Sequence, residues 1–160
     1  MWRNVVAALL LCWAFVMPAQ AGTPAGNISG QWMVHSPAPT GRWITASHDA
    51  VIQIAPCGAD ICGWIAGIVL APTDPIPKDW EGAPQCGLTI IRATPSVDGA
   101  GQTTYNGSIV DPRDGSAYHA QINLDASGDL HLRGYIGLPM FGRTQVWAPY
   151  TGKMNANCRL

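Results

Sequence analysis

The sequence predicts an all-β protein, a single antiparallel β-barrel of eight strands. Gly and Pro account for 18 and 13 of the 160 residues, and they recur so often that no segment with helical periodicity exceeds about ten residues. Short runs rich in Val, Ile, Thr, Tyr and Trp lie between clusters of turn residues. In the later runs apolar and polar residues alternate, which is typical of strands with one buried face.

The N-terminus has the features of a cleaved export signal. Arg3 precedes an apolar run from Val5 to Met17, and Ala19-Gln20-Ala21 supplies the small residues that a signal peptidase requires. We therefore expect cleavage after Ala21, one domain over residues 22–160, and a periplasmic or secreted location. No later apolar run approaches the roughly 20 residues of a membrane helix, so no membrane anchor is expected. Lipidation of Cys12 is disfavoured, because Leu11 stands where a small residue is required.

Eight runs have the composition of strands, and turn residues separate them. The predicted strands are Ile28–Val34, Ala50–Ala55, Ile61–Val69, Leu88–Ala93, Thr103–Val110, Ala117–Leu124, Leu130–Ile136 and Arg143–Ala148. The stretch 35–47 is expected to be irregular and to lie at the barrel mouth. The Pro-rich stretch 71–87 is expected to form either a lid carrying Trp80 or a plain crossover.

The last two hairpins show the clearest alternation. Tyr118, Ala120, Ile122 and Leu124 share one face of their strand, while His119, Gln121 and Asn123 occupy the other. A barrel buries one face and leaves no unpaired edge, although a two-sheet sandwich is compatible with the same strand count.

Four cysteines follow the predicted cleavage site, and an even number in an exported protein indicates disulfides. Cys57 and Cys62 flank a turn at facing positions of a hairpin, which favours a 57–62 bridge with 86–158 as its companion. The alternative links this hairpin to Cys86 and leaves Cys158 free. Without a Cys-x-x-Cys pair or clustered histidines, no metal site is expected.

Composition and motifs argue against several function classes. A net charge of −1 without a basic cluster disfavours nucleic acid as a partner. The sequence has no Gly-x-Ser-x-Gly, His-Glu-x-x-His or phosphate-loop motif, and its aspartates fall mainly in turns. We therefore expect no catalytic residues, no cofactor and no enzymatic activity.

Several motifs resemble the bacterial DUF2147 family of exported proteins over residues 28–148. They are Gly30-Gln31-Trp32, Cys57-Gly58-Ala59-Asp60-Ile61-Cys62-Gly63, Cys86-Gly87-Leu88, Asp111-Pro112-x-x-Gly115-x-x-Tyr118, Leu132-Arg133-Gly134-Tyr135-Ile136-Gly137 and Phe141-Gly142-Arg143-Thr144-Gln145-x-Trp147. The family is similar to the lipocalins, so the resemblance implies a lipocalin-like (calycin) barrel. It also implies that Trp32 plugs one end against Arg143 or Arg133.

The leading functional hypothesis is non-covalent binding of a small apolar or amphipathic molecule inside the barrel. Trp and Tyr suit such a cavity because each combines a large apolar body with one polar group. The candidate ligand-binding residues are Trp32, Trp80, Tyr105, Tyr118, Arg143 and Trp147. The alternative is a filled barrel that docks on an envelope protein through Trp43 and Trp80.

Overall fold

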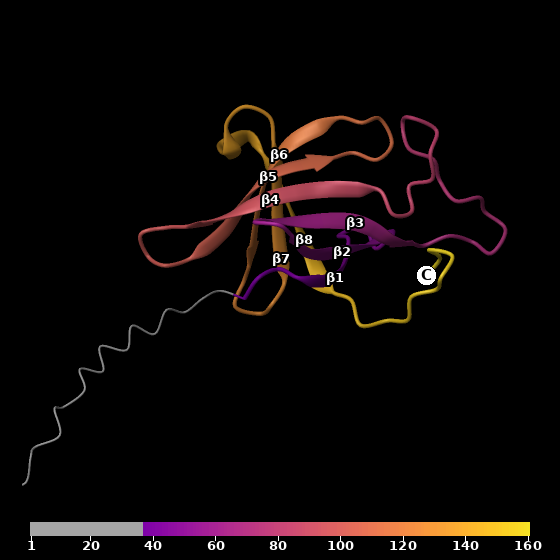
Figure 1. The fold of residues 1–160 in the computed structure, drawn as a ribbon, viewed down its shortest axis with the longest axis horizontal. Coiled ribbons are helices and arrows are strands. Elements are labelled where there is room, and N and C mark those ends of the chain that lie inside the picture. Colours follow the sequence, from indigo (N-terminus) through magenta and orange to yellow (C-terminus); the bar gives the residue numbers. More distant parts are fainter. Residues whose placement is uncertain (1–36) are drawn as a thin grey trace, which may run out of the picture. The chain divides into compact units, whose positions relative to one another are not determined.

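Residues 37–160 are described by the computed structural model, and their strands form a closed antiparallel barrel (Figure 1). Each strand pairs with the next, and the pairs Trp43–Pro149 and Ile44–Ala148 close the barrel between β1 and β8. Closure confirms the predicted barrel and excludes the sandwich. The strands are β1 Gly41–Ile44, β2 Ala50–Cys57, β3 Asp60–Ile68, β4 Thr89–Val97, β5 Thr103–Val110, β6 Ala117–Leu124, β7 Leu130–Tyr135 and β8 Arg143–Pro149.

The first strand of this barrel differs from the prediction. The predicted strand Ile28–Val34, with Trp32, lies outside the described residues. The stretch 35–47 was expected to be irregular, and this was wrong for Gly41–Ile44, which pairs along β2 from Val51 to Ile54. A four-residue strand is too short for a visible alternation, so its pairing comes from the long neighbouring strand rather than from local propensity.

The buried core lies toward one end of the barrel. Trp43, Ile54, Tyr105, Leu130 and Trp147 are all buried there, and the alternating strands supply one inward side chain at every second position. The indole of Trp43 donates a hydrogen bond to the Pro39 carbonyl oxygen at 3.0 Å, which satisfies its buried N–H. This burial contradicts the expectation that Trp43 and Trp80 form an exposed docking patch.

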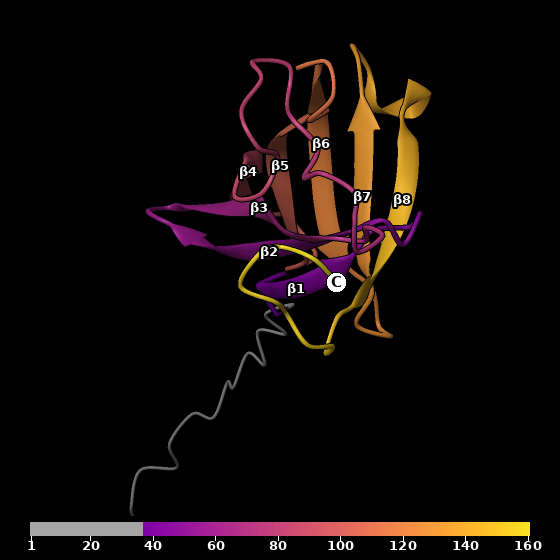
Figure 2. The same cartoon turned by 90° about the vertical axis from the view of Figure 1, so that its right-hand side faces the viewer.

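The connections between strands alternate between the two ends of the barrel. The β2–β3, β4–β5 and β6–β7 turns close one end, whereas the β1–β2, β3–β4, β5–β6 and β7–β8 connections surround the other. In Figure 2, β5 to β8 stand upright with alternating directions while β1 to β3 lie across them, and the 3-10 turn η1 (Pro139–Phe141) lies at the upper end, between β7 and β8 in the chain. Among the described residues, no helix has the length and apolar character needed to cross a membrane.

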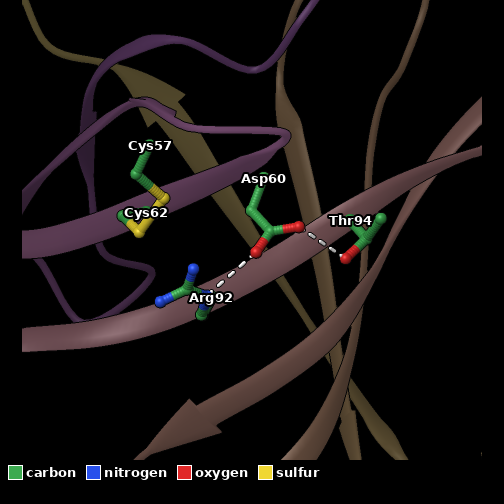
Figure 3. The surroundings of a disulfide bond; sticks show 5 residues. All are labelled: Cys57, Asp60, Cys62, Arg92 and Thr94. Atoms are coloured by element: carbon green, nitrogen blue, oxygen red, sulfur yellow. Dashed lines mark hydrogen bonds and ion pairs between the residues drawn. A yellow bond between two sulfur atoms is a disulfide. The ribbon is translucent and has the colours of Figure 1, made fainter.

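Both favoured disulfides are present in the structure. Cys57–Cys62 clamps the β2–β3 hairpin, as Figure 3 shows. Beside it, the Asp60 carboxylate accepts hydrogen bonds from Arg92 Nε at 2.9 Å and Thr94 Oγ1 at 2.7 Å, both on β4. The disulfide thus links β2 to β3 within the hairpin, and the Asp60 hydrogen bonds link the hairpin to β4.

The second bridge, Cys86–Cys158, joins the β3–β4 connection to the C-terminal segment. The same connection is also fixed to the β5–β6 turn. The buried Gln85 side chain donates hydrogen bonds to the carbonyl oxygens of Lys78 and Pro112, at 3.1 and 3.2 Å. Trp80 packs on Gly115, where an added Cβ would lie 2.9 Å from the indole. Several independent contacts therefore hold the Pro-rich stretch against the barrel.

Candidate ligand cavity

An open cavity of about 1180 Å³ occupies the end of the barrel opposite the β2–β3, β4–β5 and β6–β7 turns. Residues from all four connections at this end reach its walls: Ser47 from β1–β2, Gln85 from β3–β4, Pro112 from β5–β6, and Phe141 from β7–β8. Its volume exceeds the usual range of drug-sized sites, roughly 300–1,000 Å³, and includes the space between the surrounding connections as well as the end of the barrel interior. The side chains of the barrel therefore leave a broad recess that is open at this end.

The deeper wall is apolar. It consists of inward side chains from several strands: Ile52, Ile65, Ile90, Ile109, Leu132 and Trp147. Most of them are buried, and Ile52, Ile65 and Leu132 lie on strands β2, β3 and β7. This wall offers dispersion and hydrophobic contacts and no charge to an occupant.

One side of the cavity owes its space to a glycine. Gly134 lies at an inward position of β7, between Ala120 on β6 and Arg143 on β8 in the strand register. A Cβ at this position would meet only the Cγ2 atom of Ile109, at 4.0 Å. A larger residue here would project into the cavity without colliding with the backbone.

The mouth carries a charged cluster on two connections. The Arg113 guanidinium donates to both Asp111 carboxylate oxygens, at 3.0 and 2.7 Å, and this bonding lowers the pKa of Asp111 and raises that of Arg113. Partial burial raises the pKa of Asp49, but hydrogen bonds from Thr45 and Ser47 and the charge of Arg113 lower it overall. These carboxylates are held ionised and are already partnered.

Arg143 differs from the other arginines of the described residues. Its side chain lines the cavity but makes no hydrogen bond or ion pair with residues 37–160. The others are all bonded: Arg42 to Gln53, Arg92 to Asp60, Arg113 to Asp111, Arg133 to Pro139, and Arg159 to Ala71. The structure therefore leaves one guanidinium available to a bound molecule at the rim.

The structure brings three of the predicted ligand-binding residues together. Tyr118, Arg143 and Trp147 line the cavity. Tyr105 belongs instead to the buried core, paired with Pro95 and Ile122 in the strand register.

Two other candidates lie elsewhere. Trp80 is 43% exposed and packs on the β5–β6 turn outside the cavity lining. Trp32, the predicted plug, lies outside the described residues, so the proposed contact with Arg143 or Arg133 is untested.

Sequence reasoning missed several lining residues. Leu132, Gly134 and Gln145 are each separated by an even number of positions from an inward residue on the same strand. Alternation alone could therefore have predicted that they face inward. Asp49 and Arg113 belong to turns, where the sequence has no alternation from which an inward side could be predicted. Asp111 was among the aspartates expected only to form turns. It does form a turn, accepting a hydrogen bond from the backbone of Arg113, and it also lines the mouth.

His119 lies on the outer face of the barrel, as predicted, and so does His131 on the next strand. His119 stacks on Tyr135 with ring centroids 5.3 Å apart, and His131 Nε2 lies 2.9 Å from the Asp125 carboxylate. Neither side chain is part of the cavity lining. The hydrogen bond from His131 lowers the pKa of Asp125, as a structural ion pair does.

Comparison with known proteins identifies the class of this fold. Protein HP1028 from the human pathogen Helicobacter pylori, described as belonging to the lipocalin family, has a similar structure, with a TM-score of 0.58. The similarity covers 71% of this chain and 84% of that one, at 15% sequence identity. The domain is thus a lipocalin-like barrel.

A family model described as an uncharacterised protein conserved in bacteria, DUF2147, matches residues 41–148, and the chain belongs to this family. The predicted membership is confirmed. A search of curated proteins gave no match.

Proposed function

We propose that this protein is an exported carrier that binds a small apolar or amphipathic molecule non-covalently in the barrel cavity. The observation that carries the proposal is the open cavity of about 1180 Å³ with an apolar inner wall and a polar mouth. A packed interior would have favoured docking of an envelope protein through the outer surface.

The two parts of the cavity suit the two ends of an amphiphile. Isoleucine, leucine and tryptophan side chains line the depth, where each Å² of ligand surface removed from water contributes roughly 25 cal/mol. Burial of a few hundred Å² is sufficient for micromolar affinity after the costs of association. Tyr118, Gln145 and Arg143 offer polar groups to the end of the ligand nearer the mouth.

Export is the second part of the proposal. The N-terminal segment has the charge, apolar run and small residues of a signal peptide. The two disulfides support an oxidising compartment, because such bonds persist outside the cytosol. A measured mass equal to that of residues 22–160 would support cleavage after Ala21. A mass that includes residues 1–21, measured on protein from the periplasmic fraction, would contradict it.

The binding proposal is tested on folded, delipidated protein. We expect saturable binding of fatty acids and of fluorescent apolar probes at micromolar concentrations, with competition between the two. If no member of a broad panel binds, the carrier proposal fails. Circular dichroism before and after delipidation confirms that the barrel is intact.

A further inference from the structure

Most of the exposed large apolar side chains gather at the open end of the barrel. Of eight such residues in the described part of the chain, six lie on the connections that surround the cavity mouth. They are Val69, Trp80, Ile136, Leu138, Met140 and Phe141. Large apolar residues concentrated on one end of a soluble domain mark an interaction surface.

The β7–β8 connection, residues 136–142, is the centre of this surface. Within six residues it exposes four large apolar side chains, with Met140 at 72% and Phe141 at 76% exposure. This segment is fixed rather than loose. Arg133 on β7 donates hydrogen bonds to the carbonyl oxygens of Pro139 and Met140, at 2.7 and 3.3 Å. The backbone of Gly142 also donates to Pro139, at 2.9 Å.

The charged side chains on the two strands that flank this segment have one sign. Arg133 and Arg143 flank it on β7 and β8, and the chain from Leu130 to Leu160 contains no Asp or Glu. The carboxylates at the mouth, Asp49 and Asp111, lie on other connections, where Asp49 accepts hydrogen bonds from Thr45 and Ser47 and Asp111 from Arg113. Exposed apolar side chains with adjacent arginines match the requirements of an anionic lipid surface, which accepts the side chains below the headgroups and attracts the cations.

We propose that the open end of the barrel docks on an anionic lipid bilayer through the β7–β8 connection. A second copy of this chain is a less suitable occupant. In a symmetric dimer through this segment, Arg143 of each copy would approach its counterpart without a facing carboxylate on the same segment. Docking in this orientation turns the cavity mouth toward the lipid, because Ile136 and Phe141 also line the cavity.

The test is flotation of the protein with vesicles of phosphatidylcholine, with and without phosphatidylglycerol. Wild-type protein is expected to float with the anionic vesicles and to dissociate as salt is added. The variant Leu138→Ser/Met140→Ser is expected to lose binding by about tenfold or more, because it removes two apolar side chains from the interface. Neither residue lines the cavity, so binding of an apolar probe in solution should not change.

Val97→Ser/Val146→Ser is the matched control. It removes two exposed apolar side chains from strands, outside the β7–β8 connection, and should leave flotation at the wild-type level. Arg143→Gln should weaken binding to the anionic vesicles alone. The proposal is overturned if wild-type protein fails to float, or if Leu138→Ser/Met140→Ser floats as well as wild type. It is also overturned if this variant only converts a dimer into a monomer.

This proposal goes beyond ligand binding, and the two are separable. Protein that floats but binds no apolar probe would support docking and contradict the carrier function. Protein that binds the probe but never floats would support the carrier function and contradict docking on the bilayer.

Discussion

Gly134 on β7 lies opposite Arg143 on β8 in the antiparallel register, and both face the cavity. The absence of a side chain at Gly134 leaves room beside Arg143, whose side chain has no hydrogen-bond or ion-pair partner among residues 37–160. At this height in the barrel, Gly134 therefore provides space in the cavity and Arg143 provides a positive charge. This pairing is the basis of the first two predictions.

The first prediction is that filling the space at Gly134 weakens ligand binding. Gly134→Leu places an isobutyl group where a Cβ meets only Ile109 at 4.0 Å, so it reduces the cavity without a backbone clash. We expect probe affinity to fall at least about tenfold, since the side chain excludes ligand surface that the cavity would otherwise bury. The measurement is a fluorescence titration of delipidated protein.

Gly99→Leu is the control for this change. Gly99 lies in the β4–β5 turn at the other end of the barrel, and an added Cβ there meets no atom within 4 Å. It should bind the probe like wild type. Equal affinity in Gly134→Leu and wild-type protein would show that the probe binds elsewhere.

The second prediction concerns the polar end of the ligand. Because Arg143 faces the cavity and its side chain has no partner in the described part of the chain, a carboxylate amphiphile should bind more tightly than the alcohol of the same chain length. Arg143→Gln should remove most of this preference while leaving affinity for the alcohol nearly unchanged. Competition titrations measure both ligands on both proteins. A preference that persists in Arg143→Gln would assign the headgroup to another residue.

The third prediction concerns the disulfides. Cys86–Cys158 closes a sequence separation of 72 residues, and Cys57–Cys62 closes one of 5. The loss of loop entropy in the unfolded chain is larger for the longer loop, so its removal should cost about 4 kcal/mol against about 2 kcal/mol for the shorter one. Urea unfolding of Cys86→Ala/Cys158→Ala and Cys57→Ala/Cys62→Ala gives the comparison. The reverse order would indicate that hairpin geometry matters more than loop length.

The fourth prediction is a loss of stability in acid that depends partly on Asp60. Hydrogen bonds from Thr94 and Arg92 lower the pKa of Asp60 in the folded protein. A depressed folded pKa contributes stability above the unfolded pKa, and this contribution is lost as pH falls through the folded pKa. Asp60→Asn should therefore be less stable than wild type at neutral pH, and the difference should shrink in acid.

Urea unfolding at a series of pH values measures this difference. Glu81→Gln is the matched control, since the Glu81 side chain makes no hydrogen bond with the described residues. A pH-independent difference between Asp60→Asn and wild type would assign the effect of Asp60 to turn geometry rather than to its charge.

Most of what could be predicted from the sequence came from the alternation of apolar and polar residues along the strands. The inward face of β6, with Ala120 and Ile122, follows directly from residue parity. The Cys57–Cys62 bridge was predicted from the short turn between the two residues, although the register pairs Cys57 with Asp60 and Cys62 with Ala55, so the bridge is diagonal. The strand β1 was missed because four residues between prolines and a turn carry no periodic signal. Its position depends on pairing with β2 and β8, which sequence does not encode locally.

The cavity itself was less predictable. Which barrel end is open depends on how four connections pack, and contacts such as Gln85 with Pro112 join residues 27 positions apart. That Arg143 has no side-chain partner within residues 37–160 likewise depends on the tertiary structure, which places no acceptor beside it. Inward parity identified Tyr118 correctly as lining the cavity, but it did not separate Tyr105, which lies in the closed core.

The central claim is that the barrel is a carrier, and native mass spectrometry of protein purified without detergent from bacterial cells tests it most directly. We expect a reproducible adduct that is released on denaturation and is recovered by lipid extraction as a single class of small apolar or amphipathic molecule. The Gly134→Leu variant should lack the adduct. A clean ligand-free mass for wild-type protein, together with no binding of added amphiphiles, would contradict the claim.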